Sequence, residues 1–249
     1  SDIVAMSNAN NGAVVEDQRA VPAVLSVVYA DDSAAPGGNG GQNQPYQTIS
    51  PAIARVVAGG TIKVADGAYG ESFTVDKSLT LRSVNGRDVT TINLQSGPTY
   101  LGAIHITGAV VTIDGFTING FDAVGSGVAS TNVSVAYPAN NVTLKNNRFK
   151  IGQIGSGTTG DDGFGLVTYY DTANFIASLT VTGNDFLPLN AEGRRAFYIN
   201  PGVNQFTFTD NAITGKFTAR AGMQAKNSLV EDNVITGAGP AGSRSAGMF

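Results

Sequence analysis

Cysteine is absent from the 249 residues, and charged residues make up only 14% of them. Without cysteine the chain has no disulfide, no thiolate metal site and no cysteine nucleophile. Lysine and arginine number 15 against 19 acidic residues, and no basic run occurs. Because proteins that bind phosphate backbones gather such charges on one surface, we do not expect nucleic acid as a partner.

A long apolar run is also missing. The longest stretch, at 21–30, contains a proline and a serine and is too short to cross a bilayer, so we expect no membrane span. His105 is the sole histidine. It lies between Ile104 and Ile106 in a strand-like run, and the alternation of a strand would point its imidazole outward.

Glycine is abundant, at 32 residues, and apolar residues reach 42%. This composition favours an all-β domain of many short strands joined by tight turns. We expect residues 1–45 to form a tail, one strand and a Gly/Pro-rich loop. Residues 46–249 would form the main domain.

One short helix is predicted at 50–58. Ser50 suits the N-cap and Pro51 the first helical position, apolar residues recur at helical spacing, and Gly59 and Gly60 provide a stop.

From residue 61 onward the chain is a series of brief strand-like runs that contain a repeat. An apolar residue is followed three positions later by asparagine and, two positions further, by another apolar residue. The asparagines of this repeat are Asn147, Asn184, Asn211 and Asn233. Their separations of 37, 27 and 22 residues approach the length of one solenoid coil. Asparagine tolerates left-handed backbone angles at a bend, and its amide can bond the asparagine of the next coil, so we predict an asparagine ladder.

The ends of such a solenoid need cover, because the terminal coils expose apolar residues and unpaired strands. The helix at 50–58 would cap the first coil. After Ile235 the sequence shows no capping helix. We therefore expect either a longer solenoid or a homo-oligomer, with end-to-end assembly in which the N-terminal segment 1–30 of a neighbour adds a strand.

Three segments carry a family resemblance: VYADDS at 28–33, PYQTISPAI at 45–53, and GGTIKVADGAYGESFTVDKSLTLRS at 59–83. Together with the asparagine coils they resemble bacterial right-handed parallel β-helix proteins with the pectate-lyase-like fold. The resemblance implies that fold and an extracellular or cell-surface location. It leaves activity open, since such proteins include pectate lyases, alginate lyases and epimerases as well as non-catalytic matrix proteins.

Two sets of residues could carry chemistry. Asp161 and Asp162, in DDGFG, resemble the DDGxD calcium segment of one pectate lyase group, although Gly165 replaces the last acid and the partner acid and lysine are missing. Ca²⁺ is thus a possible ligand there, and no other cofactor is expected. A lyase or epimerase would need a basic or phenolic group to move a proton, for which Arg195, Tyr198 and Lys226 are the candidates.

Our leading hypothesis is a non-catalytic extracellular β-helix, a surface, matrix or filament component that binds polysaccharide or copies of itself. The alternative is a lyase or epimerase that acts on an acidic polysaccharide.

Overall fold

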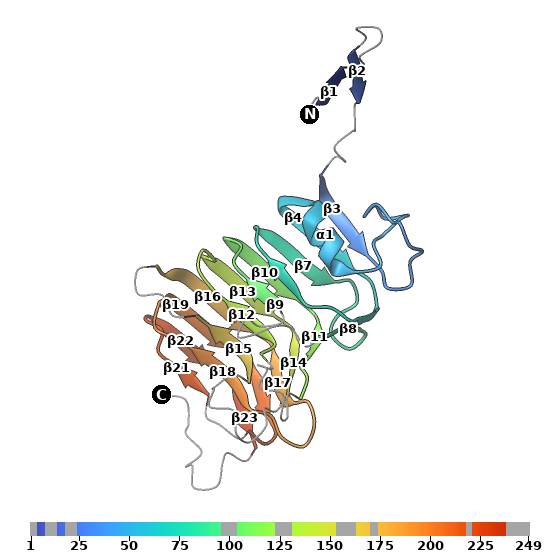
Figure 1. Ribbon diagram of the computed structural model, residues 1–249. Coiled ribbons are helices and arrows are strands. Elements are labelled where there is room, and N and C mark those ends of the chain that lie inside the picture. Colours follow the sequence, from blue (N-terminus) through green and yellow to red (C-terminus); the bar gives the residue numbers. More distant parts are fainter. Residues whose placement is uncertain are drawn as a thin grey trace.

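The computed structural model describes residues 4–7, 14–17, 24–95, 104–122, 131–152, 163–169, 174–217 and 221–237. Nearly all of its elements are short strands, and they lie in three parallel sheets that run the length of a solenoid (Figure 1). We name these sheets 1, 2 and 3.

Each coil passes through the three sheets in order, and each strand pairs in parallel with its equivalents in the coils before and after it. Sheet 1 contains β3 (Leu25–Ala30), β4 (Val56–Val64), β7 (Leu79–Ser83), β10 (Val110–Asp114), β13 (Asn141–Lys145), β16 (Ile176–Thr182), β19 (Val203–Thr209) and β22 (Ser228–Glu231). Sheet 2 contains β5 (Gly67–Tyr69), β8 (Thr90–Asn93), β11 (Thr117–Asn119), β14 (Arg148–Ile151), β17 (Asp185–Pro188), β20 (Ala212–Thr214) and β23 (Val234–Thr236). Sheet 3 contains β6 (Phe73–Val75), β9 (Ile104–Ile106), β12 (Val133–Val135), β15 (Phe164–Thr168), β18 (Arg195–Ile199) and β21 (Gly222–Met223). Outside the solenoid, β1 (Val4–Ser7) and β2 (Val14–Asp17) pair antiparallel.

The core lies inside the coils, because alternate residues of each strand point inward. In sheet 2, Tyr69, Ile92 and Ile118 follow one another in register, and Phe149 and Phe186 continue the column. All five side chains are buried. The rings of Phe149 and Phe186 stack with centroids 4.7 Å apart, so equivalent positions of successive coils contact one another directly.

The helix differs from its prediction. It spans Ile49–Arg55, with Thr48 as N-cap, so Ser50 and Pro51 are its second and third residues. Thr48 makes no side-chain cap bond. Instead the Glu71 carboxylate accepts hydrogen bonds from the backbone N–H groups of Ile49 and Ser50 and from the Ser50 hydroxyl. A carboxylate distant in sequence thus accepts the hydrogen bonds of the free N–H groups in the first turn of the helix. The spacing of residues near the helix could not predict this contact.

The helix ends early because Val56 turns into extended backbone and β4 begins there. Gly59 and Gly60, predicted as the helix stop, lie inside β4. A Cβ at Gly60 would come within 2.7 Å of the Ser26 carbonyl oxygen, so this strand needs glycine to lie against β3.

At the N-terminal end, α1 packs on β3 and β4 with Ile49, Ala52 and Ile53 buried (Figure 1). In the described part of the chain, no helix has the length and apolar character needed to span a membrane. Strand β3 lies before the boundary that we predicted at residue 45. It nevertheless pairs with β4 and forms the first strand of sheet 1.

The turn between sheets 1 and 2 contains the predicted asparagines. In six coils it is two residues long, and in the last four of these the second residue is Asn147, Asn184, Asn211 or Asn233. The left-handed conformation falls on the residue before each of them, at Asn146, Gly183, Asp210 and Asp232, where φ is between 55° and 66°. Our explanation that the ladder asparagines themselves take this conformation was therefore wrong. Their role is hydrogen bonding.

Candidate functional site

The connections from one sheet to the next differ in length. The longest of them join sheet 2 to sheet 3 and span residues 94–103, 120–132 and 152–163. Connections from sheet 3 to sheet 1 are shorter, and most of those from sheet 1 to sheet 2 are two-residue turns. Because long connections in a rigid scaffold commonly carry function, the strands of sheet 3 that follow these connections are candidates for a site.

Register places the outward side chains of sheet 3 in columns. One column contains His105, Ser134, Val167 and Tyr198 on successive strands. Phe164 and Arg195 are in register beside it.

Arg195 is the centre of a cluster on this face, which we call the Arg195 cluster: Phe164, Arg195, Tyr198 and Gln224. The guanidinium carbon lies 5.5 Å from the ring centroid of Phe164 and 5.6 Å from that of Tyr198. The two ring centroids are 6.0 Å apart, and the Gln224 amide donates a 3.0 Å hydrogen bond to the Tyr198 hydroxyl. Phe164 is buried, Arg195 and Tyr198 are partly exposed, and Gln224 is exposed, so the accessible side of the cluster presents a planar cation, a phenol ring and an amide.

Of the three candidate catalytic residues, Arg195 and Tyr198 lie together on β18. Lys226 makes different contacts. Its ammonium lies 5.6 Å from the ring centroid of Phe175, and its backbone N–H bonds the Val203 carbonyl at the start of β19. The described contacts therefore join two of the three predicted residues and leave Lys226 beside another aromatic ring.

His105 lies on the same face of sheet 3. Its Nδ1 is 2.8 Å from the Ser134 hydroxyl oxygen, and its ring meets that of Tyr169 edge-on with centroids 6.3 Å apart. Burial lowers the pKa of His105 below its ordinary value. Burial thus favours the neutral imidazole, which can donate or accept a hydrogen bond.

The predicted calcium ligands Asp161 and Asp162 lie outside the described residues. Among the residues that the structure does describe, no three His, Cys, Asp or Glu side chains gather where a metal ion could sit. Gly165, which replaces the last acid of the calcium segment, is buried in β15. A Cβ there would lie 2.6 Å from the Ala196 carbonyl oxygen.

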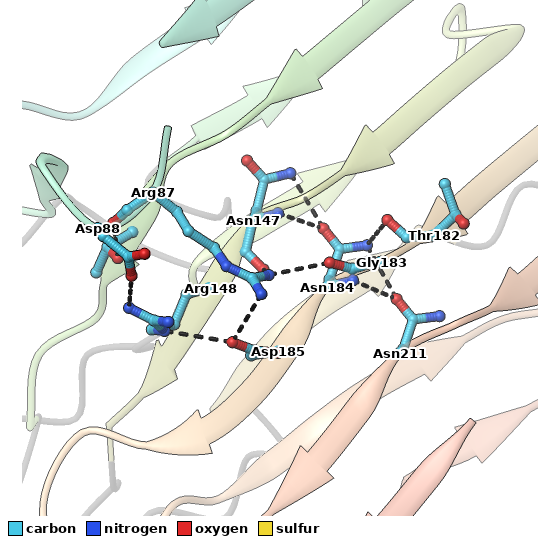
Figure 2. Close-up of polar contacts among 10 residues, drawn as sticks. Arg87, Asp88, Asn147, Arg148, Thr182, Gly183, Asn184, Asp185 and Asn211 are labelled. Atoms are coloured by element: carbon cyan, nitrogen blue, oxygen red, sulfur yellow. Dashed lines mark hydrogen bonds and ion pairs between the residues drawn. The ribbon is translucent and has the colours of Figure 1, made fainter. Parts of the chain in front are cut away.

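The asparagine turns form a second polar region (Figure 2). The last three ladder asparagines each accept, at Oδ1, the backbone N–H of the asparagine one coil earlier; the distances are 2.8 Å to Asn184, 2.9 Å to Asn211 and 2.9 Å to Asn233. At the other end, Asn147 accepts the N–H of Phe116, which takes the asparagine position in its own coil. The four asparagines thus form a continuous stack along the solenoid.

Sequence reasoning missed the ion pairs beside this ladder. Arg87, in the connection between β7 and β8, donates hydrogen bonds to the carbonyl oxygens of Asn147 and Gly183 and lies 3.2 Å from the Asp185 carboxylate (Figure 2). Arg148 joins Asp185 to Asp88 at 3.3 and 2.8 Å. These contacts link residues up to 96 positions apart, and no local pattern announces them. Every charge in this group is paired, so we interpret the group as an ion-pair network that holds three coils together. We call Arg87, Asp88, Arg148 and Asp185 the clamp.

No protein-family model matches the sequence, and no curated protein matches it either. Solved structures do resemble it. A rhamnogalacturonan lyase matches with a TM-score of 0.58 at 12% identity, over 86% of this chain and 65% of its own. The pectin methylesterase PemA from Erwinia chrysanthemi matches with a TM-score of 0.50 at 14% identity, over 77% of this chain and 56% of its own. The chain thus spans less than two thirds of either structure. At these identities the likeness concerns the fold alone, and the chain has the pectate-lyase-like, right-handed parallel β-helix fold.

Proposed function

We propose that the protein is a non-catalytic polysaccharide-binding β-helix that works outside the cell, and that the Arg195 cluster is its binding site. The observation that carries the proposal is the position of the Arg195 guanidinium over the rings of Phe164 and Tyr198. A guanidinium binds carboxylates and hydroxyls through several N–H groups, and an aromatic face packs against the apolar face of a sugar ring. Two structures that share the fold are named as enzymes of rhamnogalacturonan and pectin, which favours a polysaccharide over other ligands.

Affinity electrophoresis in gels that contain polygalacturonate tests this proposal. We expect Arg195→Ala and Tyr198→Ala each to weaken retardation by about tenfold, because each removes a polar contact and a stacking surface. Lys226→Ala is the matched control, since it removes a cation–aromatic pair of similar geometry beside Phe175. Unchanged retardation of both variants would overturn the proposal.

The alternative function, a polysaccharide lyase or epimerase, is favoured by the proximity of Arg195 and Tyr198 on β18. A phenol could exchange a proton with the sugar while the guanidinium stabilises the charge that develops on the uronate. A lyase would produce unsaturated uronates with new ultraviolet absorbance, and an epimerase would exchange the C5 hydrogen with deuterium from the solvent. If the wild type gives either result and Tyr198→Phe does not, the enzyme function would replace the binding proposal.

We also propose that the C-terminal end of the described solenoid associates with a second copy. Ile235 continues a core column of sheet 2 after Phe186 and Ile213, yet 49% of its surface is exposed. Its neighbour Val234 is 58% exposed. Light scattering over a concentration series should show association that Ile235→Glu abolishes. A wild-type protein that stays monomeric at every concentration would refute it.

A further inference from the structure

The outer face of sheet 1 carries threonine at one register position of six successive strands. The strands are in register throughout, so the side chains form one row along the solenoid axis: Thr61, Thr80, Thr112, Thr143, Thr180 and Thr207. All six side chains are partly exposed. We call them the threonine row.

The row is regular and its hydroxyls are unused. Parallel strands lie about 4.8 Å apart, and the branched Cβ of threonine restricts χ1, so hydroxyl and methyl groups repeat at that spacing. Thr90, Thr117 and Thr182 elsewhere in the solenoid each bond another protein group. Within the part of the chain that the structure describes, we find no such bond for the six hydroxyls of the row. They are therefore available to a ligand.

Beside the row, the next outward column carries two cations on neighbouring strands. Lys63 on β4 and Arg82 on β7 are directly in register, and neither pairs with a carboxylate in the described residues. Like charges opposite each other on neighbouring strands are destabilising. The arrangement is notable in a chain of net charge −4. On the other side of Arg82, Asp114 of β10 is in register with it but makes its ion pair with Lys145, so an anion bound beside Lys63 and Arg82 would relieve the repulsion between these two cations.

The surroundings of these cations suit a sugar polymer. The Lys63 ammonium lies 5.5 Å from the ring centroid of Tyr29, which continues the same column on β3. Further along, Lys145 is neutralised by Asp114 at 3.5 Å. The positive charge is thus local, at one end of a long hydroxyl row.

We infer that this face of sheet 1 binds a linear anionic polysaccharide that runs along the solenoid axis. Its carboxylates or sulfates lie against Lys63 and Arg82, and its hydroxyls bond the threonine row. In an extended chain each sugar advances by roughly the spacing of one coil, so successive sugars meet successive threonines. Two unpaired cations are too few for the many phosphate contacts of nucleic acid, and the charges oppose an uncharged lattice such as ice.

This site is separate from the Arg195 cluster, and the inference goes beyond the proposed function. With both sites, one molecule would hold two polysaccharide chains and cross-link them.

The test compares three full-length variants: Lys63→Ala with Arg82→Ala, Thr143→Val with Thr180→Val, and the matched control Thr91→Val on the outer face of sheet 2. Valine keeps the shape and branching of threonine and removes only the hydroxyl. The probes are polygalacturonate, dextran sulfate and neutral dextran, measured by isothermal titration at low salt. We expect the wild type to bind the two anionic polymers and not dextran. The cation variant should lose about tenfold in affinity and the threonine variant about threefold, with Thr91→Val unchanged.

The results separate this inference from the proposed function. If Arg195→Ala alone abolishes all binding, the sheet 1 site is refuted and the Arg195 cluster stands. If only the sheet 1 variants weaken binding, the Arg195 cluster is refuted instead. Two other results would overturn the assignment to polysaccharide. One is that the wild type binds double-stranded DNA as tightly as it binds polygalacturonate. The other is that the wild type inhibits ice recrystallisation and the variant with Thr143→Val and Thr180→Val does not.

Discussion

The asparagine ladder should be a principal source of stability, and Asn184→Ala measures its contribution. Asn184 is fully buried. Its Oδ1 accepts the Asn147 backbone N–H at 2.8 Å, and its Nδ2 donates to Asn211 Oδ1 at 3.0 Å (Figure 2). The Nδ2 group also donates to the Leu144 carbonyl at 2.9 Å. Alanine keeps the backbone of the turn and removes every one of these bonds.

The expected cost follows from the groups left without a partner. The Asn147 N–H loses its acceptor and the Leu144 carbonyl loses this donor, whereas Asn211 Oδ1 still accepts the backbone N–H of residue 184. A buried polar group left unsatisfied costs about 1–3 kcal/mol, so the substitution should lower the free energy of unfolding by about 3 kcal/mol. That is a large share of the roughly 5–15 kcal/mol typical of a folded domain.

Urea unfolding followed by far-ultraviolet circular dichroism provides the measurement. Asn233→Ala is the matched control, because Asn233 accepts the Asn211 N–H at 2.9 Å in the same way but is only partly buried, so water can replace its amide. We expect this variant to lose less than about 1 kcal/mol. Equal and small losses in the two variants would refute the idea that burial of the ladder stabilises the solenoid.

Three further predictions concern other parts of the molecule. Arg87→Ala should lower the free energy of unfolding by about 1–2 kcal/mol, because its partly exposed guanidinium ties three coils together; chemical unfolding at low and high salt checks this, and no loss in either would contradict the clamp. Burial lowers the pKa of His105 from 6.5, so the unfolded chain takes up the proton first, and stability should fall as the pH drops below about 6.5. The melting temperature of the wild type and of His105→Gln would be measured between pH 7 and 5. We expect the melting temperature of the variant to fall less steeply with decreasing pH, and an equal fall in both proteins would refute the prediction. Glu71→Ala should speed hydrogen exchange in α1 and lower stability by about 1–2 kcal/mol; exchange at the wild-type rate would show that the carboxylate does not cap the helix.

The architecture was largely predictable from the sequence, since it depends on patterns that repeat. Alternating apolar residues and the spacing of Asn147, Asn184, Asn211 and Asn233 predict stacked coils, because each coil has to fill the same interior and make the same bend. The helix was predicted in place but not in detail. Its capping group, Glu71, comes from a later coil, and the valine at 56 is drawn into β4 by pairing with β3.

The set of distant residues that share a face could be seen only in the folded chain. A coil that contains an insertion shifts the sequence spacing without shifting the register, so the six threonines of sheet 1 do not appear as a periodic row in the sequence. Arg87 likewise reaches Gly183 because solenoid coils lie close in space while their residues are far apart in the chain. Local patterns in the sequence are enough to predict the repeating strand and turn. The stacking of the coils determined the Arg195 cluster, the clamp and the threonine row, because each is made by side chains that meet only across coils.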